Sequence, residues 1–203
     1  MLTIGFDTAL DKMYVALKND DKIIESKIVE NKDGKYHSAF LISTIKDILK
    51  NNGFRPSDID LITTDIGPGS FTGIRACITV ARVLAQQLNC KVIGVSSLEI
   101  LSKLANSNPL VALDARKHCA YLYIDGKIQG AVYIDKVKEI VENGNYDIIT
   151  DSKMSEIFGG KEYLKSNPNL GEILVDIATE RAKDSNCDWR QLKPLYIQPP
   201  PMG

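Results

Sequence analysis

Two stretches decide the fold of this 203-residue chain: Leu-Thr-Ile-Gly-Phe-Asp at residues 2–7 and Leu-Val-Ala-Leu-Asp at residues 110–114. Each is an apolar run that ends in an aspartate, which is typical of a buried strand. A tyrosine follows each aspartate seven residues later, at Tyr14 and Tyr121, and a tight turn with a Lys-Ile pair comes next. The order of strand, Asp, strand, turn and strand therefore occurs twice. It predicts an α/β protein built from a duplicated unit that begins with three strands.

The segments after the first copy alternate between helix and strand. Spacings of three and four between apolar residues predict helices over 36–50 and 73–89, and the second of these follows a glycine-rich turn. A break at Asn-Ser-Asn-Pro then predicts a domain boundary. We expect one domain over 1–106, with the glycine-rich loop, and a smaller, less regular one over 107–203. The second domain is expected to contain a helix over 171–184 and to end in a proline-rich tail without a core-forming pattern.

Composition narrows the class of protein. The 25 basic and 26 acidic residues give a net charge of −1, which excludes a polybasic nucleic-acid arm or an anionic-membrane binder as the dominant character. The four cysteines form no Cys-x-x-Cys pair and no cluster with histidine, as is typical of buried thiols in a reducing compartment. The first residues lack the basic region of a signal peptide. No stretch approaches the 18 consecutive apolar residues that a membrane-spanning helix needs. We therefore expect a cytoplasmic protein with no membrane partner.

The sharpest local feature is Gly-Pro-Gly-Ser-Phe-Thr-Gly-Ile-Arg at residues 67–75, between a predicted strand and a predicted helix. Such a turn aims backbone N–H groups at one point beside a helix N-terminus, which suits a phosphate. The candidate nucleotide-binding residues are Asp7, Gly67, Gly69, Ser70, Thr72 and Gly73. The alternative is a tight turn whose glycines need a positive φ, with Ser70 or Thr72 capping the helix. The segment matches neither of the usual phosphate-loop fingerprints.

The remaining polar candidates are ambiguous. Asp7 and Asp114 end strands in the two copies, where an aspartate either holds a metal–nucleotide or simply terminates the strand. Asp114-Ala-Arg116 fits a catalytic pair or a local turn with an ion pair. His37 and His118 have no second ligand at metal-binding spacing, so a surface or capping role is favoured. We predict no catalytic residue and no metal ligand.

Four segments together resemble the bacterial TsaB (YeaZ) family: Ile-Gly-Phe-Asp-Thr at 4–8, His-Ser at 37–38, the glycine segment at 67–75 and Leu-Asp-Ala-Arg at 113–116. The resemblance runs in order over residues 2 to about 125, and its most specific part is the glycine segment. It implies a two-lobed actin-like (ASKHA) fold of two RNase H-like βββαβα units. It also implies a role in forming threonylcarbamoyladenosine at position 37 of tRNAs that read ANN codons.

The paralogous transferase of that family, TsaD, carries two metal-binding histidines in a Val-Asn-His-Leu-Glu-Ala-His pattern. This chain reads Val-Ser-Ser-Leu-Glu-Ile-Leu from Val95, so that Ser97 and Leu101 stand at the two histidine positions. Leucine cannot ligate a metal. The resemblance therefore implies a non-catalytic partner subunit rather than a transferase.

The resemblance also implies the partners. They are a TsaD-type paralogue, a TsaE-type ATPase, a second copy of the chain when the paralogue is absent, and tRNA indirectly. This subunit would require no cofactor of its own, whereas the complex uses ATP and Mg²⁺. The helices over 36–50 and 73–88 would form the interface, with candidate contacts at His37, Phe40, Leu41, Thr44, Arg75, Thr79, Arg82 and Val83.

Two enzyme alternatives remain open. One is an ATP-binding or ATP-hydrolysing enzyme of the actin-like superfamily, with Asp7, the loop over 67–73 and Asp114 around the nucleotide. The other is a metallo-glycoprotease, an older assignment for this superfamily. This chain lacks the histidine ligands that the metal ion of such an enzyme needs.

Overall fold

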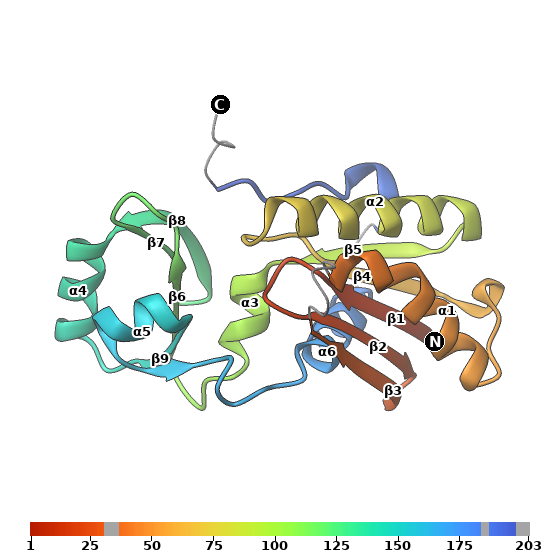
Figure 1. Ribbon diagram of the computed structural model, residues 1–203, viewed down its shortest axis with the longest axis horizontal. Coiled ribbons are helices and arrows are strands. Elements are labelled where there is room, and N and C mark those ends of the chain that lie inside the picture. The colour runs from red at the N-terminus through yellow and green to blue at the C-terminus, as the bar shows by residue number, and fades with distance from the viewer. Residues whose placement is uncertain (31–36, 184–186, 198–203) are drawn as a thin grey trace. The chain divides into compact units, whose positions relative to one another are not determined.

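The computed structural model of the protein describes residues 1–30, 37–183 and 187–197. The chain forms two compact units. The first comprises Met1–Ser97 and Asn169–Leu195, and the second comprises Leu98–Pro168 together with Tyr196 and Ile197. Figure 1 shows that each unit contains its own β-sheet with helices packed on it.

The first unit is built on a five-stranded sheet with the order β3-β2-β1-β4-β5. Its strands are β1 (Leu2–Asp7), β2 (Met13–Asn19), β3 (Lys22–Val29), β4 (Leu61–Asp65) and β5 (Lys91–Val95). The first three strands are antiparallel, whereas β4 and β5 run parallel to β1. The carboxyl ends of β1, β4 and β5 therefore meet at one edge of the sheet.

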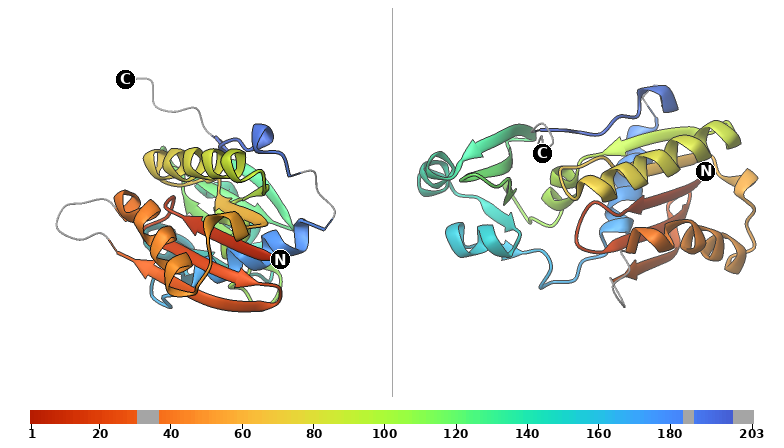
Figure 2. Two further views of the ribbon diagram at one scale, coloured as in Figure 1. Left: turned by 90° about the vertical axis from the view of Figure 1, so that its right-hand side faces the viewer. Right: turned by 45° about the horizontal axis from the view of Figure 1, so that its top comes forward.

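Helices cover both faces of this sheet (Figures 1 and 2). They are η1 (His37–Phe40), α1 (Leu41–Asn51), η2 (Pro56–Asp58), α2 (Phe71–Leu88), α6 (Leu170–Arg181) and η3 (Trp189–Gln191). On one face, alternate residues of β1 (Leu2, Ile4 and Phe6) form a buried core with apolar residues of α1 and α2. On the other face, Leu174 and Val175 of α6 lie over β1 at Gly5.

The second unit repeats this arrangement. Its strands are β6 (Pro109–Asp114), β7 (Cys119–Ile124), β8 (Lys127–Tyr133), β9 (Asp147–Thr150) and β10 (Lys161–Glu162). Their order, β10-β9-β6-β7-β8, is that of the first sheet read from the other end. The helices α4 (Ile134–Asn143) and α5 (Ser152–Phe158) pack on one face, and α3 (Ser97–Ser102) precedes the sheet in the chain. The predicted duplication is confirmed.

The structure divides the chain differently from the expected boundary between 1–106 and 107–203. The helix predicted over 171–184 is observed as α6, but it belongs to the first unit because its buried residues pack on the first sheet. The chain thus crosses into the second unit after Ser97 and returns at Asn169.

The segment after α6 is also attached to the first unit. Leu192 is buried in the core of that unit, and the Leu195 N–H donates to the Ile66 carbonyl at 2.8 Å. The start of the tail predicted over 194–203 is therefore bound to the residue that follows β4, and residues 198–203 lie outside the described part of the chain. None of the helices in the described part is long and apolar enough to cross a membrane.

Candidate functional site

The edge where the parallel strands end carries two buried acids in the first unit. Asp7 ends β1 and Asp65 ends β4, and the register pairs Phe6 with Thr64, so the two aspartates are adjacent along the edge. Both side chains are essentially inaccessible, with exposed fractions of 1% and 0%. Asp65 was missed in the sequence analysis, although its strand ends in an aspartate in the same way as those of Asp7 and Asp114.

The hydrogen bonds of the two acids come from the chain itself. The Oδ1 atom of Asp7 accepts from the Ala9 N–H at 2.5 Å, whereas its Oδ2 atom is buried without a partner in the described part of the chain. Asp65 accepts from the Ser97 hydroxyl at 2.8 and 2.7 Å and from the Gly67 N–H at 2.6 Å. Each acid thus holds a loop that follows a strand, and neither is open to solvent.

Burial governs the charge of this pair. Loss of solvent raises the pKa of Asp7 well above its usual range, and the neighbouring Asp65 carboxylate raises it further. Burial also raises the pKa of Asp65 to about 7, although the hydrogen bonds from Ser97 and Gly67 oppose this shift. Burial and the repulsion between the two carboxylates therefore favour the protonated form of Asp7, since ionising both acids would place two like charges in a buried region.

The glycine-rich loop packs directly against the turn that follows β1. A Cβ atom at Gly73 would lie 1.8 Å from the Thr8 carbonyl oxygen, and one at Gly69 would lie 2.4 Å from the Ala9 carbonyl oxygen. The Ser70 N–H donates to the Ala9 oxygen at 2.7 Å, and the Thr8 hydroxyl donates to the Gly73 oxygen at 2.8 Å. Gly69 and Gly73 are therefore required by a close approach of backbone to backbone, whereas the alternative of a positive φ holds for Gly67, whose φ is 104°.

Several N–H groups of the loop are already used within the chain. The Gly67 N–H donates to Asp65, the Ser70 N–H to Ala9, the Gly73 N–H to the Ser70 hydroxyl at 3.3 Å, and the Ile74 N–H to the Ser70 carbonyl. Ser70 is the N-cap of α2, as one of the two alternatives predicted. A phosphate at this loop would have to compete with these internal bonds. Nucleotide binding by Asp7, Gly67, Gly69, Ser70, Thr72 and Gly73 stays a prediction.

The thiol of Cys77 lies beside the same turn and is also inaccessible. It accepts from the Thr8 N–H at 3.1 Å, and burial raises its pKa to about 12. A thiol with so high a pKa is almost wholly protonated at neutral pH and is a poor nucleophile. In the described part of the chain, no three His, Cys, Asp or Glu side chains are grouped so as to hold a metal ion.

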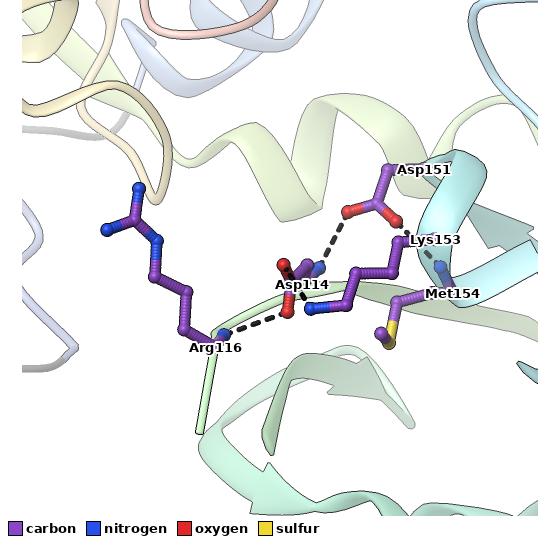
Figure 3. Close-up of polar contacts among 5 residues, drawn as sticks. All are labelled: Asp114, Arg116, Asp151, Lys153 and Met154. Carbon is purple, nitrogen blue, oxygen red and sulfur yellow. Dashed lines mark hydrogen bonds and ion pairs between the residues drawn. The ribbon is translucent and has the colours of Figure 1, made fainter. Parts of the chain in front are cut away.

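The corresponding acid of the second unit has a different environment. The Asp114 Oδ2 atom accepts from the Lys153 ammonium at 2.8 Å, and its Oδ1 atom accepts from the Arg116 backbone N–H at 2.8 Å (Figure 3). Partial burial favours a higher pKa for Asp114, but the ammonium and the N–H outweigh it and lower the pKa. The predicted local turn is present, but the ion pair within it is formed by Lys153 and not by Arg116.

The candidate interface residues fall into two groups. Leu41 and Thr44 are buried in their own unit, and Phe40 packs against the same core, so these three side chains serve the unit itself. Arg82 is half-buried with its guanidinium 5.6 Å from the Trp189 ring centroid. Arg75, Thr79 and Val83 are exposed. His37 lies in η1, and its side chain is outside the described part of the structure.

Two exposed apolar residues on these helices were missed. Ile42 on α1 is 67% exposed, and Phe71 at the start of α2 is 43% exposed beneath the Arg75 guanidinium. Ile42 stands outside the spacing of the buried residues Leu41, Ile45, Ile48 and Leu49, which was the available signal. On α2, the exposed residues Phe71, Arg75, Thr79 and Val83 recur every four positions and so share one face. We call Ile42 together with these four residues the α1–α2 surface.

Comparison with known proteins places this fold and sequence in one family. Residues 22–158 match the family model of TsaD, tRNA N6-adenosine threonylcarbamoyltransferase. The chain is 33% identical over 102 residues to the tRNA threonylcarbamoyladenosine biosynthesis protein TsaB of Bacillus subtilis, covering 50% of this chain and 44% of that protein. It is 29% identical over 153 residues to the TsaB of Buchnera aphidicola from Schizaphis graminum, covering 68% and 71%.

A solved structure shares the whole architecture. It is a protein described as similar to peptidase YeaZ from Pseudomonas aeruginosa, with a TM-score of 0.74 at 21% identity, and the match covers 97% of this chain and 99% of that one. The expected two-lobed actin-like fold with two RNase H-like units is thereby confirmed. The chain spans about half the length of the Bacillus relative, so the activity and partners of the full-length relatives come to it only as proposals.

The close packing at Gly73 generates a first prediction. Gly73→Ala places a methyl group within 1.8 Å of the Thr8 oxygen, and because the obstacle is backbone the turn or α2 must shift. We expect a loss of several kcal/mol of unfolding free energy or a failure to fold, as for other severe overpacking. Urea unfolding measures the change. Thr72→Ala, at the exposed neighbouring position, should stay within about 0.5 kcal/mol of the wild type, and equal stability of both variants would contradict the contact.

The buried acid pair generates a second prediction. An acid whose pKa is higher in the folded state stabilises the protein below its unfolded pKa and loses that contribution as pH rises to its folded pKa. The unfolding free energy should therefore fall between about pH 4 and about pH 7, the folded value of Asp65. Asp7→Asn removes one charge of the pair while its side-chain oxygen can still accept from Ala9, so this fall should become smaller.

Urea unfolding at pH 5 and at pH 8 measures this difference. Asp21→Asn is the matched control, because Asp21 is exposed in a turn and its substitution should leave the pH dependence unchanged. An identical pH dependence in the wild type and in Asp7→Asn would contradict the raised pKa of Asp7.

Proposed function

Because the chain belongs to the TsaD family, in its TsaB (YeaZ) branch, we propose that it is a subunit of the system that forms threonylcarbamoyladenosine on tRNA. Its role is to bind and activate a TsaD-type transferase, and the transfer itself takes place on that partner. The names of the Bacillus and Buchnera relatives support the pathway. The environment of α3 supports the assignment of the transfer reaction to the partner.

The observation that carries the proposal is the pair of residues at the histidine positions of the transferase. The Ser97 hydroxyl is bound to both carboxylate oxygens of Asp65, and Leu101 is completely buried. Neither side chain offers a ligand to a metal ion, because the first is engaged and the second has no donor atom. The acids at the strand ends are likewise occupied or inaccessible. The residues that would do chemistry in an actin-like enzyme act here as internal supports.

The α1–α2 surface supports a binding role. Three large apolar side chains, Ile42, Phe71 and Val83, are exposed on helices whose opposite sides fill the core of the first unit. Exposed aromatic and aliphatic side chains of this kind, with an arginine beside them, are typical of the centre of a protein–protein interface. We propose that this surface binds the TsaD-type paralogue, and a second copy of the chain in its absence. A TsaE-type ATPase would complete the system and use ATP and Mg²⁺, with no cofactor needed by this subunit.

The alternative of an ATP-hydrolysing enzyme has weaker support. It requires the glycine-rich loop to receive phosphate, but the N–H groups of Gly67, Ser70, Gly73 and Ile74 are bound within the chain. It also requires an accessible carboxylate in the first unit, whereas Asp7 and Asp65 are buried.

A charge on the α1–α2 surface tests the proposal. Val83→Glu places a carboxylate where the partner's apolar surface would cover it, and burying an unpaired charge is costly. We expect the affinity for the TsaD-type transferase to fall at least about tenfold, which corresponds to roughly 1.4 kcal/mol. Size-exclusion chromatography with light scattering measures complex formation, and modification of tRNA in the reconstituted system should fall in parallel.

Ile128→Glu is the matched control, since Ile128 is an exposed isoleucine on β8 of the second unit. It should bind and function as the wild type does. A Val83→Glu variant that folds, forms the complex and supports full modification would place the interface elsewhere. Failure of the wild-type chain to bind any TsaD-type partner would refute the proposed function itself.

A further inference from the structure

The turn between β6 and β7 has an unusual backbone. Arg116, Lys117 and His118 follow one another with φ values of 61°, 48° and 58°. All the other non-glycine residues with positive φ in the described part of the chain are Asn or Asp, which tolerate this region best. Three consecutive left-handed residues with long or ring-bearing side chains are costly, and such strain persists only where the surroundings enforce it.

The surroundings of this turn do enforce it. The Arg116 N–H donates to Asp114 at 2.8 Å, the Cys119 N–H to the Arg116 carbonyl at 2.9 Å, and the Ile134 N–H to the His118 carbonyl at 3.0 Å. Asp114 is itself fixed, because Lys153 binds its carboxylate and Asp151 accepts from its backbone N–H (Figure 3). Asp114, for which the sequence allowed either a catalytic pair or a local turn, therefore holds the backbone of the turn.

The three side chains are not part of this scaffold. Arg116, Lys117 and His118 are all exposed, and within the described residues none of their side chains makes a hydrogen bond or an ion pair. Figure 3 shows the Arg116 guanidinium extended away from Asp114, so that Arg116 contacts this acid through its backbone N–H and not through its side chain. A rigid, strained turn thus presents three neighbouring basic side chains to solvent.

An exposed aromatic ring lies beside the turn. Tyr133, at the end of β8, is opposite Cys119 in the β7–β8 pairing and is 71% exposed, the largest fraction among the exposed large hydrophobic residues. Tyr121 stands two positions from Cys119 on the same face of β7. The nearest acid on the following helix is Asp135, which is accompanied by Lys136. The charge around the ring is therefore basic on the side of the turn.

We propose that the basic turn of Arg116, Lys117 and His118, together with Tyr133, binds unpaired nucleotides of an RNA. The basic side chains contact phosphates, and the tyrosine ring stacks on a base. An acidic protein segment would be attracted by the same charges, but the α1–α2 surface offers several exposed large apolar side chains to a protein, whereas Tyr133 is the one exposed large hydrophobic residue beside this turn among the described residues. The inference deepens the proposed function, on which the identity of the RNA as tRNA rests, and it replaces the expectation of an indirect contact with a direct one.

Binding of labelled RNA, followed by fluorescence anisotropy over a range of salt concentrations, tests the inference. The probes are a short single-stranded RNA with the chain alone and an unmodified tRNA transcript with the chain bound to its transferase. The Arg116→Glu, Lys117→Glu double variant should lose affinity for both probes at least about tenfold. The slope of its affinity against salt concentration should decrease by the amount that corresponds to about two lost phosphate contacts. Tyr133→Ala should lose about tenfold, and Tyr133→Phe should bind as the wild type does.

The control is the Lys127→Glu, Lys138→Glu double variant, which makes the same charge change at exposed lysines of β8 and α4 in the second unit. It should bind both probes as the wild type does. Equal losses in the control and in the turn variant, or no loss in the turn variant, would overturn the inference. A turn variant that binds RNA normally but loses the transferase would assign the turn to a protein contact instead. Because the single-stranded probe needs only the chain, it tests the inference even if no transferase binds.

Discussion

The contact between the turn after β1 and the glycine-rich loop determines much of the first unit. It brings Thr8 and Ala9 against Gly69 and Gly73 so closely that no side chain fits between the two backbones. Hydrogen bonds from Ser70 and Thr8 hold the contact from both sides. The start of α2 is thereby fixed relative to the sheet. With the inner side of α2 in the core, its opposite side is exposed.

The same contact explains why residues that resemble a nucleotide site act as structure. A loop that receives phosphate needs free N–H groups, and here several of those groups bind the neighbouring turn, the Asp65 carboxylate or the α2 cap. The two lobes treat their strand-end acids differently as well. Burial raises the pKa of Asp7 and of Asp65, whereas Lys153 helps to lower the pKa of Asp114, which fixes a basic turn. Asp7 and Asp114 occupy equivalent positions in the two units, but their different surroundings give them different structural roles.

Much of the fold was predictable from the sequence because the patterns that indicate it are local. The repeated strand–Asp–strand pattern and the helix periodicities depend on residues that are neighbours in the chain, and the three leading strands of each sheet formed as they predict, whereas β10 and α5 were not predicted. The return of α6 to the first sheet was not predictable in this way, because its apolar face fits either unit until the packing against β1 is known. The close approach at Gly73 was also hidden, since a glycine required by a neighbouring backbone looks the same in sequence as a glycine required by a turn. At the interface, Leu41 was assigned to a partner although the periodicity of α1 places it in the core.

The central claim is that this chain works through binding and that its buried acids do no chemistry. The most direct measurement is the initial rate of tRNA threonylcarbamoylation in a system reconstituted from the chain, a TsaD-type transferase and a TsaE-type ATPase, with wild-type and Asp7→Asn chains compared at equal amounts of complex. We expect equal rates, because the Asp7 carboxylate is sealed beneath the turn that it supports. A variant that folds and forms the complex but loses the rate would show that Asp7 takes part in the reaction and would contradict the account.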